Sequence, residues 1–131
     1  MTKTARMILI LNAIVIGSIG LAYLVDPNLL LANYGLSVGE VGMDNMLRST
    51  YGGLFVAIAG LFALGSVKEN RRRDALGLLA LFMGGLAAGR IASLTLAGVP
   101  DGSMHMLLAY EATAFAVAVF LYQRTPAATA R

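Results

Sequence analysis

The sequence predicts an all-α protein: a four-helix transmembrane bundle with a short interfacial helix in the first outer loop. Three observations predict this fold class. Hydrophobic residues make up 58% of the chain and charged residues only 13%, about half the charged share of a typical soluble domain. Four apolar runs are each long enough to cross a bilayer, which takes about 20 helical residues. The basic residues gather in alternate flanks of these runs.

The four apolar runs form a single integral membrane domain over residues 1–131. Lipid offers no hydrogen bonds to the backbone, so the runs are expected to be helices rather than strands. The first run ends in GSIGLAYLVDP, which lacks a signal-peptide cleavage site, so this span is expected to be retained. The expected spans are about 7–25, 46–67, 75–97 and 104–122.

Eight of the ten lysine and arginine residues lie on one side of the predicted spans. These eight are Lys3, Arg6, Lys68, Arg71, Arg72, Arg73, Arg124 and Arg131. The loops on the opposite side carry the acidic residues Asp26, Glu40, Asp44 and Asp101. Basic flanks stay in the cytoplasm, so both termini are expected there. The basic run KENRRRD is therefore interpreted as a topology signal, and nucleic acid is not an expected partner.

The first loop carries the signals of a short helix. Asp26 is a residue type that caps helix starts, and Pro27 fits the first helical position. Gly35 suits a helix end, so a short helix at the outer interface is expected between them. Asp44 is expected to cap the second span. The later loop GVPDGS is typical of a tight turn, which makes the third and fourth spans antiparallel neighbours.

Two charged residues lie deep inside the predicted spans. Arg90 comes seven residues before the outer end of the third span, and Glu111 comes seven residues after the outer start of the fourth. At a rise of 1.5 Å per residue, both are expected about 10 Å below the outer boundary. An isolated charge at such a depth costs about 2.5–3.5 kcal/mol or more. Equal depth on neighbouring antiparallel helices therefore predicts an ion pair between Arg90 and Glu111.

Other polar side chains gather at similar depths in the outer half of the predicted bundle. These are Arg48, Tyr51, Ser93, Thr95, His105 and Tyr110. The Arg90–Glu111 pair admits three interpretations. It fixes helix register and rotation, it forms part of a ligand or partner site, or it relays protons. The relay is the least favoured, because arginine does not release a proton and the spans carry no second acid to continue a path.

Small residues recur along the third span. Gly85, Gly89 and Ser93 follow one another at intervals of four, and Gly53 begins a similar series on the second span. Such patterns let membrane helices approach closely. Close packing within one bundle is the favoured interpretation of these residues, and homodimerisation through the same groove is the alternative.

The composition also bounds the chemistry. The chain has no cysteine and a single histidine, His105. A zinc site or a bis-histidine haem would therefore need ligands from elsewhere. No catalytic set of nucleophile, histidine and acid is recognisable. The sequence thus predicts a protein that is not an enzyme, with no metal site and no cofactor.

Three motifs carry a resemblance to a known family. They are RSTYGGLFVAIAGLF at 48–62, GLAAGRIASL at 85–94 and the pair Tyr110-Glu111. Together they resemble a family of small bacterial four-span membrane proteins catalogued only as a domain of unknown function. The layout is similar, less closely, to DoxX-like four-helix membrane proteins. The resemblance implies a four-helix bundle in a bacterial inner membrane and no particular reaction. The matching residues are Arg48, Tyr51, Gly52, Gly53, Gly89, Arg90 and Glu111.

The expected function is non-catalytic. The bundle is expected to hold a lipid-like or anionic amphipathic ligand, or a partner helix, in an outer-leaflet pocket. Two arginines, Arg48 and Arg90, against one glutamate, Glu111, would leave a local excess of positive charge that suits a phosphate or carboxylate. Membrane lipids are thus the expected partners. An accessory subunit of a larger respiratory or photosynthetic complex, a homodimer and a small proton-coupled transporter are the alternatives.

Overall fold

The computed structural model describes residues 2–98 and 104–126, and almost all of them are helical. Four segments are long and apolar enough to cross a membrane: Thr2–Val25, Val41–Val67, Glu69–Leu96 and Met104–Arg124. This confirms the predicted all-α bundle and indicates a multi-pass membrane protein. The second segment begins at Val41, earlier than expected. The tight turn predicted after Gly98 lies, at residues 99–103, outside the described residues, as does Arg131.

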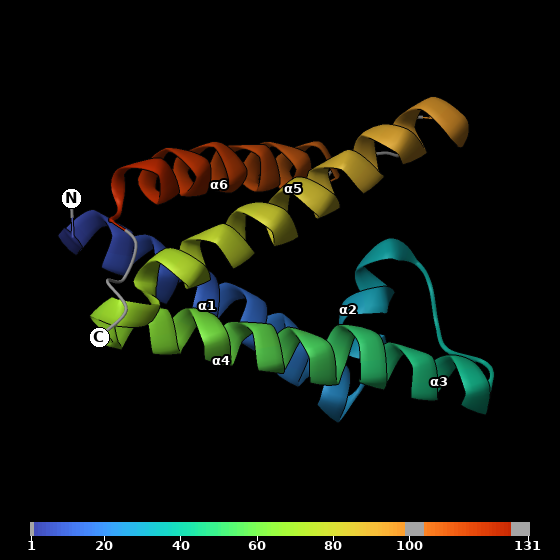
Figure 1. The fold of residues 1–131 in the computed structure, drawn as a ribbon. Helices are drawn as coiled ribbons and strands as arrows, with labels where there is room; N and C mark the ends of the chain where they lie inside the picture. The colour runs from blue at the N-terminus through green and yellow to red at the C-terminus, as the bar shows by residue number, and fades with distance from the viewer. Residues whose placement is uncertain (1, 99–103, 127–131) are drawn as a thin grey trace.

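The four long segments form two packed pairs. Helix α1 (Thr2–Val25) packs along α4 (Leu54–Val67), and α5 (Arg72–Leu96) packs along α6 (Met104–Arg124). The pairs lie close together where α1 starts and α6 ends, and they diverge toward the opposite end (Figure 1).

The tightest part of the core lies where the two pairs meet. Leu9 of α1, Phe62 of α4, and Leu76, Leu79 and Met83 of α5 are fully buried there. These large apolar side chains contact one another rather than the surface of the bundle. Cores inside membrane proteins are stabilised by such close packing of side chains. The core therefore holds α1, α4 and α5 together at this end of the bundle.

Glycines allow the closest helix contacts, but they are not the ones that the sequence pattern indicated. A Cβ on Gly65 would overlap Ala75 just after the turn η3 (Glu69–Arg71), and one on Gly84 would lie 2.9 Å from Cδ2 of Phe115. Gly84 thus brings α5 against α6.

The predicted close packing at Gly53, Gly85, Gly89 and Ser93 is wrong. A Cβ on Gly85 or Gly89 would meet nothing within 4 Å, and one on Gly53 would meet only the Arg48 carbonyl of the same segment at 3.9 Å. Gly85, Gly89 and Ser93 instead line a pocket. The physical reason is the divergence of the two pairs, which carries this face of α5 away from α4.

The first loop contains the predicted short helix. Helix α2 (Asn28–Leu31) continues into η1 (Ala32–Tyr34) and ends at Gly35, whose φ of 67° is left-handed. Pro27 rather than Asp26 is the residue that directly precedes α2, and the backbone N–H of Asn28 donates to Asp26 Oδ1 at 2.9 Å. The side chain Oδ1 of Asn28 accepts from the Val38 N–H at 2.8 Å, which ties the two ends of the loop together.

The second span differs from a regular helix in one place. It consists of α3 (Val41–Leu47), a π-helical segment η2 (Arg48–Gly53) and α4. Glu40 rather than Asp44 is the residue that precedes this helix, so the predicted cap at Asp44 is wrong. Within η2, Gly52 packs against α1, where a Cβ would lie 2.8 Å from Leu24 Cδ2. π-Segments of this kind are frequent at functional sites.

We expect Gly65→Ala to destabilise the bundle by about 1–3 kcal/mol, because the new methyl overlaps Ala75. Thermal unfolding in mild detergent measures the effect. Gly60→Ala is the matched control in the same helix, since a Cβ there meets nothing within 4 Å. Equal melting temperatures for the two variants would contradict the described contact between α4 and α5.

Candidate functional site

The predicted ion pair between Arg90 and Glu111 is present and bidentate. Arg90 Nε donates to Glu111 Oε2 at 2.7 Å, and Nη2 donates to Oε1 at 2.8 Å. The Glu111 side chain is only 5% exposed, whereas that of Arg90 is 28% exposed. The carboxylate is therefore enclosed between α5 and α6, and the guanidinium is the part of the pair that reaches open space.

Arg90 retains hydrogen-bonding capacity beyond this pair. Its Nη1 also contacts the Met104 sulfur at 3.1 Å, a weak acceptor. A guanidinium carries five N–H groups. Two of them have no acceptor among residues 2–98 and 104–126. The group can thus bind Glu111 and still donate to an oxygen atom of a second molecule.

A pocket of about 460 Å³ opens beside Arg90. One wall comes from α5, one from the start of α6, and the third contributor is Tyr51 of η2. Apolar side chains and glycines form most of the lining, which is typical of small-molecule sites. The lining residues are Tyr51, Gly85, Leu86, Gly89, Arg90, Ser93, Leu94, Met104, His105 and Leu108.

The pocket brings together four of the predicted polar site residues. The pocket is lined by Tyr51, Arg90, Ser93 and His105. Glu111 does not line it but accepts hydrogen bonds from Arg90. Tyr51 is supported by aromatic packing on Tyr23 of α1, with ring centroids 5.3 Å apart. Tyr23 was not among the predicted site residues.

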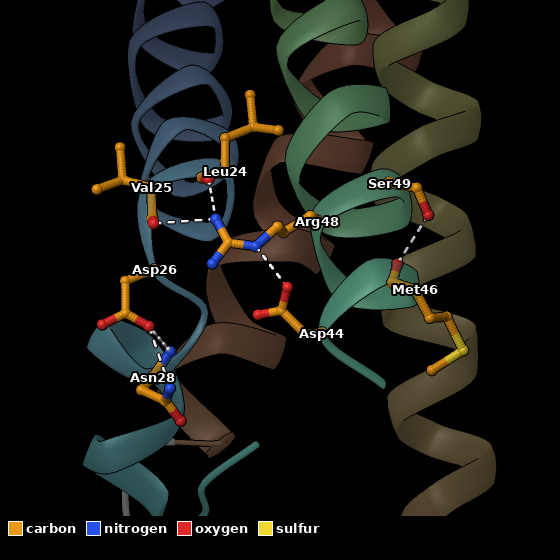
Figure 2. Close-up of polar contacts among 8 residues, drawn as sticks. All are labelled: Leu24, Val25, Asp26, Asn28, Asp44, Met46, Arg48 and Ser49. Atoms are coloured by element: carbon orange, nitrogen blue, oxygen red, sulfur yellow. Dashed lines mark hydrogen bonds and ion pairs between the residues drawn. The ribbon is translucent and has the colours of Figure 1, made fainter. Parts of the chain in front are cut away.

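Arg48 does not line the pocket, contrary to the prediction. Its Nε donates to Asp44 Oδ2 at 2.7 Å, and its Nη1 donates to the backbone carbonyls of Leu24 and Val25 (Figure 2). These carbonyls end α1, so Arg48 caps that helix from a neighbouring segment. The cap also fixes the start of η2 against α1.

The excess of positive charge predicted for the site is absent from the described residues. Arg48 is paired with Asp44 and Arg90 with Glu111, so each arginine has its own carboxylate. The prediction counted two arginines against one glutamate because Asp44 was assigned to a helix cap. The spacing of four residues from Asp44 to Arg48, typical of a helical ion pair, is the signal that could have identified this partner.

Tyr110 also lies away from the pocket. Its hydroxyl donates to Asn12 Oδ1 at 2.8 Å, and the Asn12 amide donates to the Ile8 carbonyl at 2.8 Å. Asn12 is fully buried in α1, so this bond joins α1 to α6 inside the bundle. An asparagine within the apolar run MILILNAIV was a signal for such a contact, since polar groups in membrane spans seek partners.

The arrangement is suited to holding a molecule with a polar head and an apolar body. Arg90, Tyr51, Ser93 and His105 are the polar lining residues, and apolar side chains and glycines form the rest of the wall. Within the described ranges, no three His, Asp or Glu side chains lie close enough together to hold a metal ion.

Comparison with known proteins yields one match. A family described as "Domain of unknown function (DUF4345)" matches residues 4–122. The match therefore extends beyond the motifs of the last three spans into the first. The chain has no match among curated proteins and none among solved structures.

We expect Arg90→Leu and Glu111→Leu each to destabilise the protein by about 2–4 kcal/mol, because each leaves a charge unpaired in apolar surroundings. The double variant should lose less than either single variant, since it leaves no charge behind. Reversible unfolding in mixed micelles measures the three free energies. Arg48→Leu combined with Glu111→Leu is the control and should be additive. Additive losses for Arg90 and Glu111 would refute their pairing.

Proposed function

The chain belongs to the family described as a domain of unknown function (DUF4345), and we propose that it is a non-catalytic membrane protein that holds a lipid-like amphipathic molecule. The molecule occupies the pocket between α5, α6 and Tyr51. Its polar head contacts Arg90, Ser93 and the Tyr51 hydroxyl, and its apolar part lies along the glycine face of α5. The family description adds no reaction or ligand, so the argument rests on the pocket.

This proposal rests mainly on one observation: the open face of α5 at Gly85 and Gly89 lies beside Arg90, which has two N–H groups without an acceptor among the described residues. Glycine in a membrane helix usually permits a neighbouring helix to approach. At Gly85 and Gly89 nothing lies within 4 Å of a Cβ position, yet both line a pocket of about 460 Å³. That volume falls within the range of small-molecule sites, about 300–1,000 Å³. The missing side chains thus make room for a ligand rather than for a helix of this chain.

The polar residues of the pocket support holding rather than conversion. Ser93 and His105 both line it, but no hydrogen bond joins them in the part of the chain that the structure describes. The nearest carboxylate, Glu111, has both oxygens engaged by Arg90. A general base needs a free acceptor within reach of the proton that it removes, and Glu111 does not offer one in this arrangement.

We place the pocket in the outer leaflet of a bacterial inner membrane. One end of the spans, which we call the basic end, is flanked by lysine and arginine residues: Lys3, Arg6, Lys68, Arg71–Arg73 and Arg124. The opposite end, which carries Asp26, Glu40 and Asp44, is the acidic end, and the pocket lies toward it. Basic flanks remain in the cytoplasm, so the acidic end faces outward in this proposal.

We expect Gly89→Leu to abolish retention of an amphipathic ligand, because a leucine side chain fills the open space at this position. Native mass spectrometry of protein extracted in mild detergent should show an added lipid-like mass on the wild type and none on the variant. Gly60→Leu is the matched control, since Gly60 is also a helical glycine with open space and lies outside this pocket.

Two outcomes would count against the proposal. If wild-type protein carries no added mass and no added lipid raises its melting temperature, the proposed ligand is contradicted. A wild type that retains a second polypeptide, lost in Gly89→Leu, would instead identify the occupant as a partner helix. That result would favour an accessory subunit of a larger complex or a homodimer.

The orientation is testable because the chain has no cysteine. Ser37→Cys places a thiol on the exposed loop at the acidic end, and Asn70→Cys places one on the exposed turn at the basic end. In intact bacterial spheroplasts, a membrane-impermeant maleimide should label Ser37→Cys and should label Asn70→Cys only after permeabilisation. The reverse pattern would place the pocket in the inner leaflet.

A further inference from the structure

We infer that the pocket selects an amphipathic molecule whose head group is uncharged and carries carbonyl or hydroxyl oxygens, in preference to one with an anionic head. This inference rests on the proposed function and specifies the chemical class of the ligand. It departs from the sequence-based prediction, which favoured phosphate or carboxylate.

The charge balance of the site is the first support. Arg90 is the charged residue among the described lining residues, and Glu111 neutralises it through two hydrogen bonds of 2.7 and 2.8 Å. The second arginine, Arg48, lies outside the lining and is neutralised by Asp44. The pair beside the pocket therefore presents no net charge to a ligand.

The enclosure of Glu111 is the second support. Its side chain is 5% exposed and accepts its hydrogen bonds from Arg90. Among the described residues, no other cation forms an ion pair with Glu111. A phosphate on the two remaining N–H groups of Arg90 would place a second anion on a guanidinium that Glu111 already neutralises, and the two anions would repel each other. Because Glu111 neutralises Arg90, an anion would be attracted only by the dipole of this ion pair. That attraction is smaller than the free-energy cost of removing water from the anion.

The donors that remain suit a neutral acceptor. Two N–H groups of Arg90 lack an acceptor in residues 2–98 and 104–126, and two residues that carry hydroxyl groups, Tyr51 and Ser93, line the same pocket. An ester carbonyl or a hydroxyl oxygen accepts such bonds without adding charge, and it loses less hydration on entering the pocket. The leucines and glycines of the lining then contact the apolar part.

The test compares two lipids with identical tails, dioleoylglycerol and dioleoylphosphatidate. Binding of each to the full chain is titrated by native mass spectrometry in mild detergent under identical buffer conditions. Only binding that Gly89→Leu abolishes is counted, because an anionic lipid also binds the arginines at the basic end. We expect dioleoylglycerol to bind the pocket about tenfold more tightly, a modest electrostatic discrimination.

A charge variant then tests the cause. Glu111→Gln leaves Arg90 unbalanced, so the preference should reverse and favour dioleoylphosphatidate. Asp44→Asn is the matched control, since it removes the same charge beside an arginine that does not line the pocket. Its lipid preference should equal that of the wild type.

The outcomes separate this inference from the proposed function. Tighter pocket binding of dioleoylphosphatidate by the wild type overturns the neutral head group but leaves a ligand pocket in place. Binding of both lipids that is insensitive to Gly89→Leu overturns the proposed function itself. An unchanged preference in a folded Glu111→Gln variant refutes the charge balance as the cause. If that variant does not fold, the wild-type comparison still decides the inference.

Discussion

The structure at the acidic end depends on one requirement: every charge within the membrane-spanning segments needs a partner. Glu111 is enclosed between α5 and α6 and binds Arg90 through both oxygens. This pair joins α5 to α6 beside the pocket that Arg90 lines. An uncompensated charge there would favour collapse of the surrounding helices or entry of water. The matched pair lets the space between the helices stay open and apolar.

Glycine serves two opposite purposes on the same helix. Gly84 lies against the Phe115 ring and draws α5 onto α6, whereas the next residue, Gly85, faces open space in the pocket. Successive residues on an α-helix point about 100° apart, so one helix can present a contact face and a cavity face side by side. The same small-residue composition therefore supports tight packing on one face of the helix and a pocket wall on another.

The fold and the ion pair could be predicted from the sequence because both follow from local costs. In lipid, a long apolar run is stable as a helix and in few other structures. The equal depths of Arg90 and Glu111 made an ion pair the arrangement of lowest free energy. The role of the glycines could not be predicted, since intervals of four residues do not tell whether a helix face meets a neighbour or a space. The partner of Arg48 was missed because Asp44 was assigned to a cap. The π-segment depends on contacts with α1 that lie far away in sequence.

The π-segment has an evolutionary consequence. A π-turn holds one residue more than the α-turn it replaces, so deleting one residue within 48–53 would restore a regular helix and rotate everything before it by about 100° relative to α4. Arg48 would then lose the carbonyls at the end of α1, and Asp44 would turn away with it. Homologues are thus expected to conserve the length of the segment 48–53.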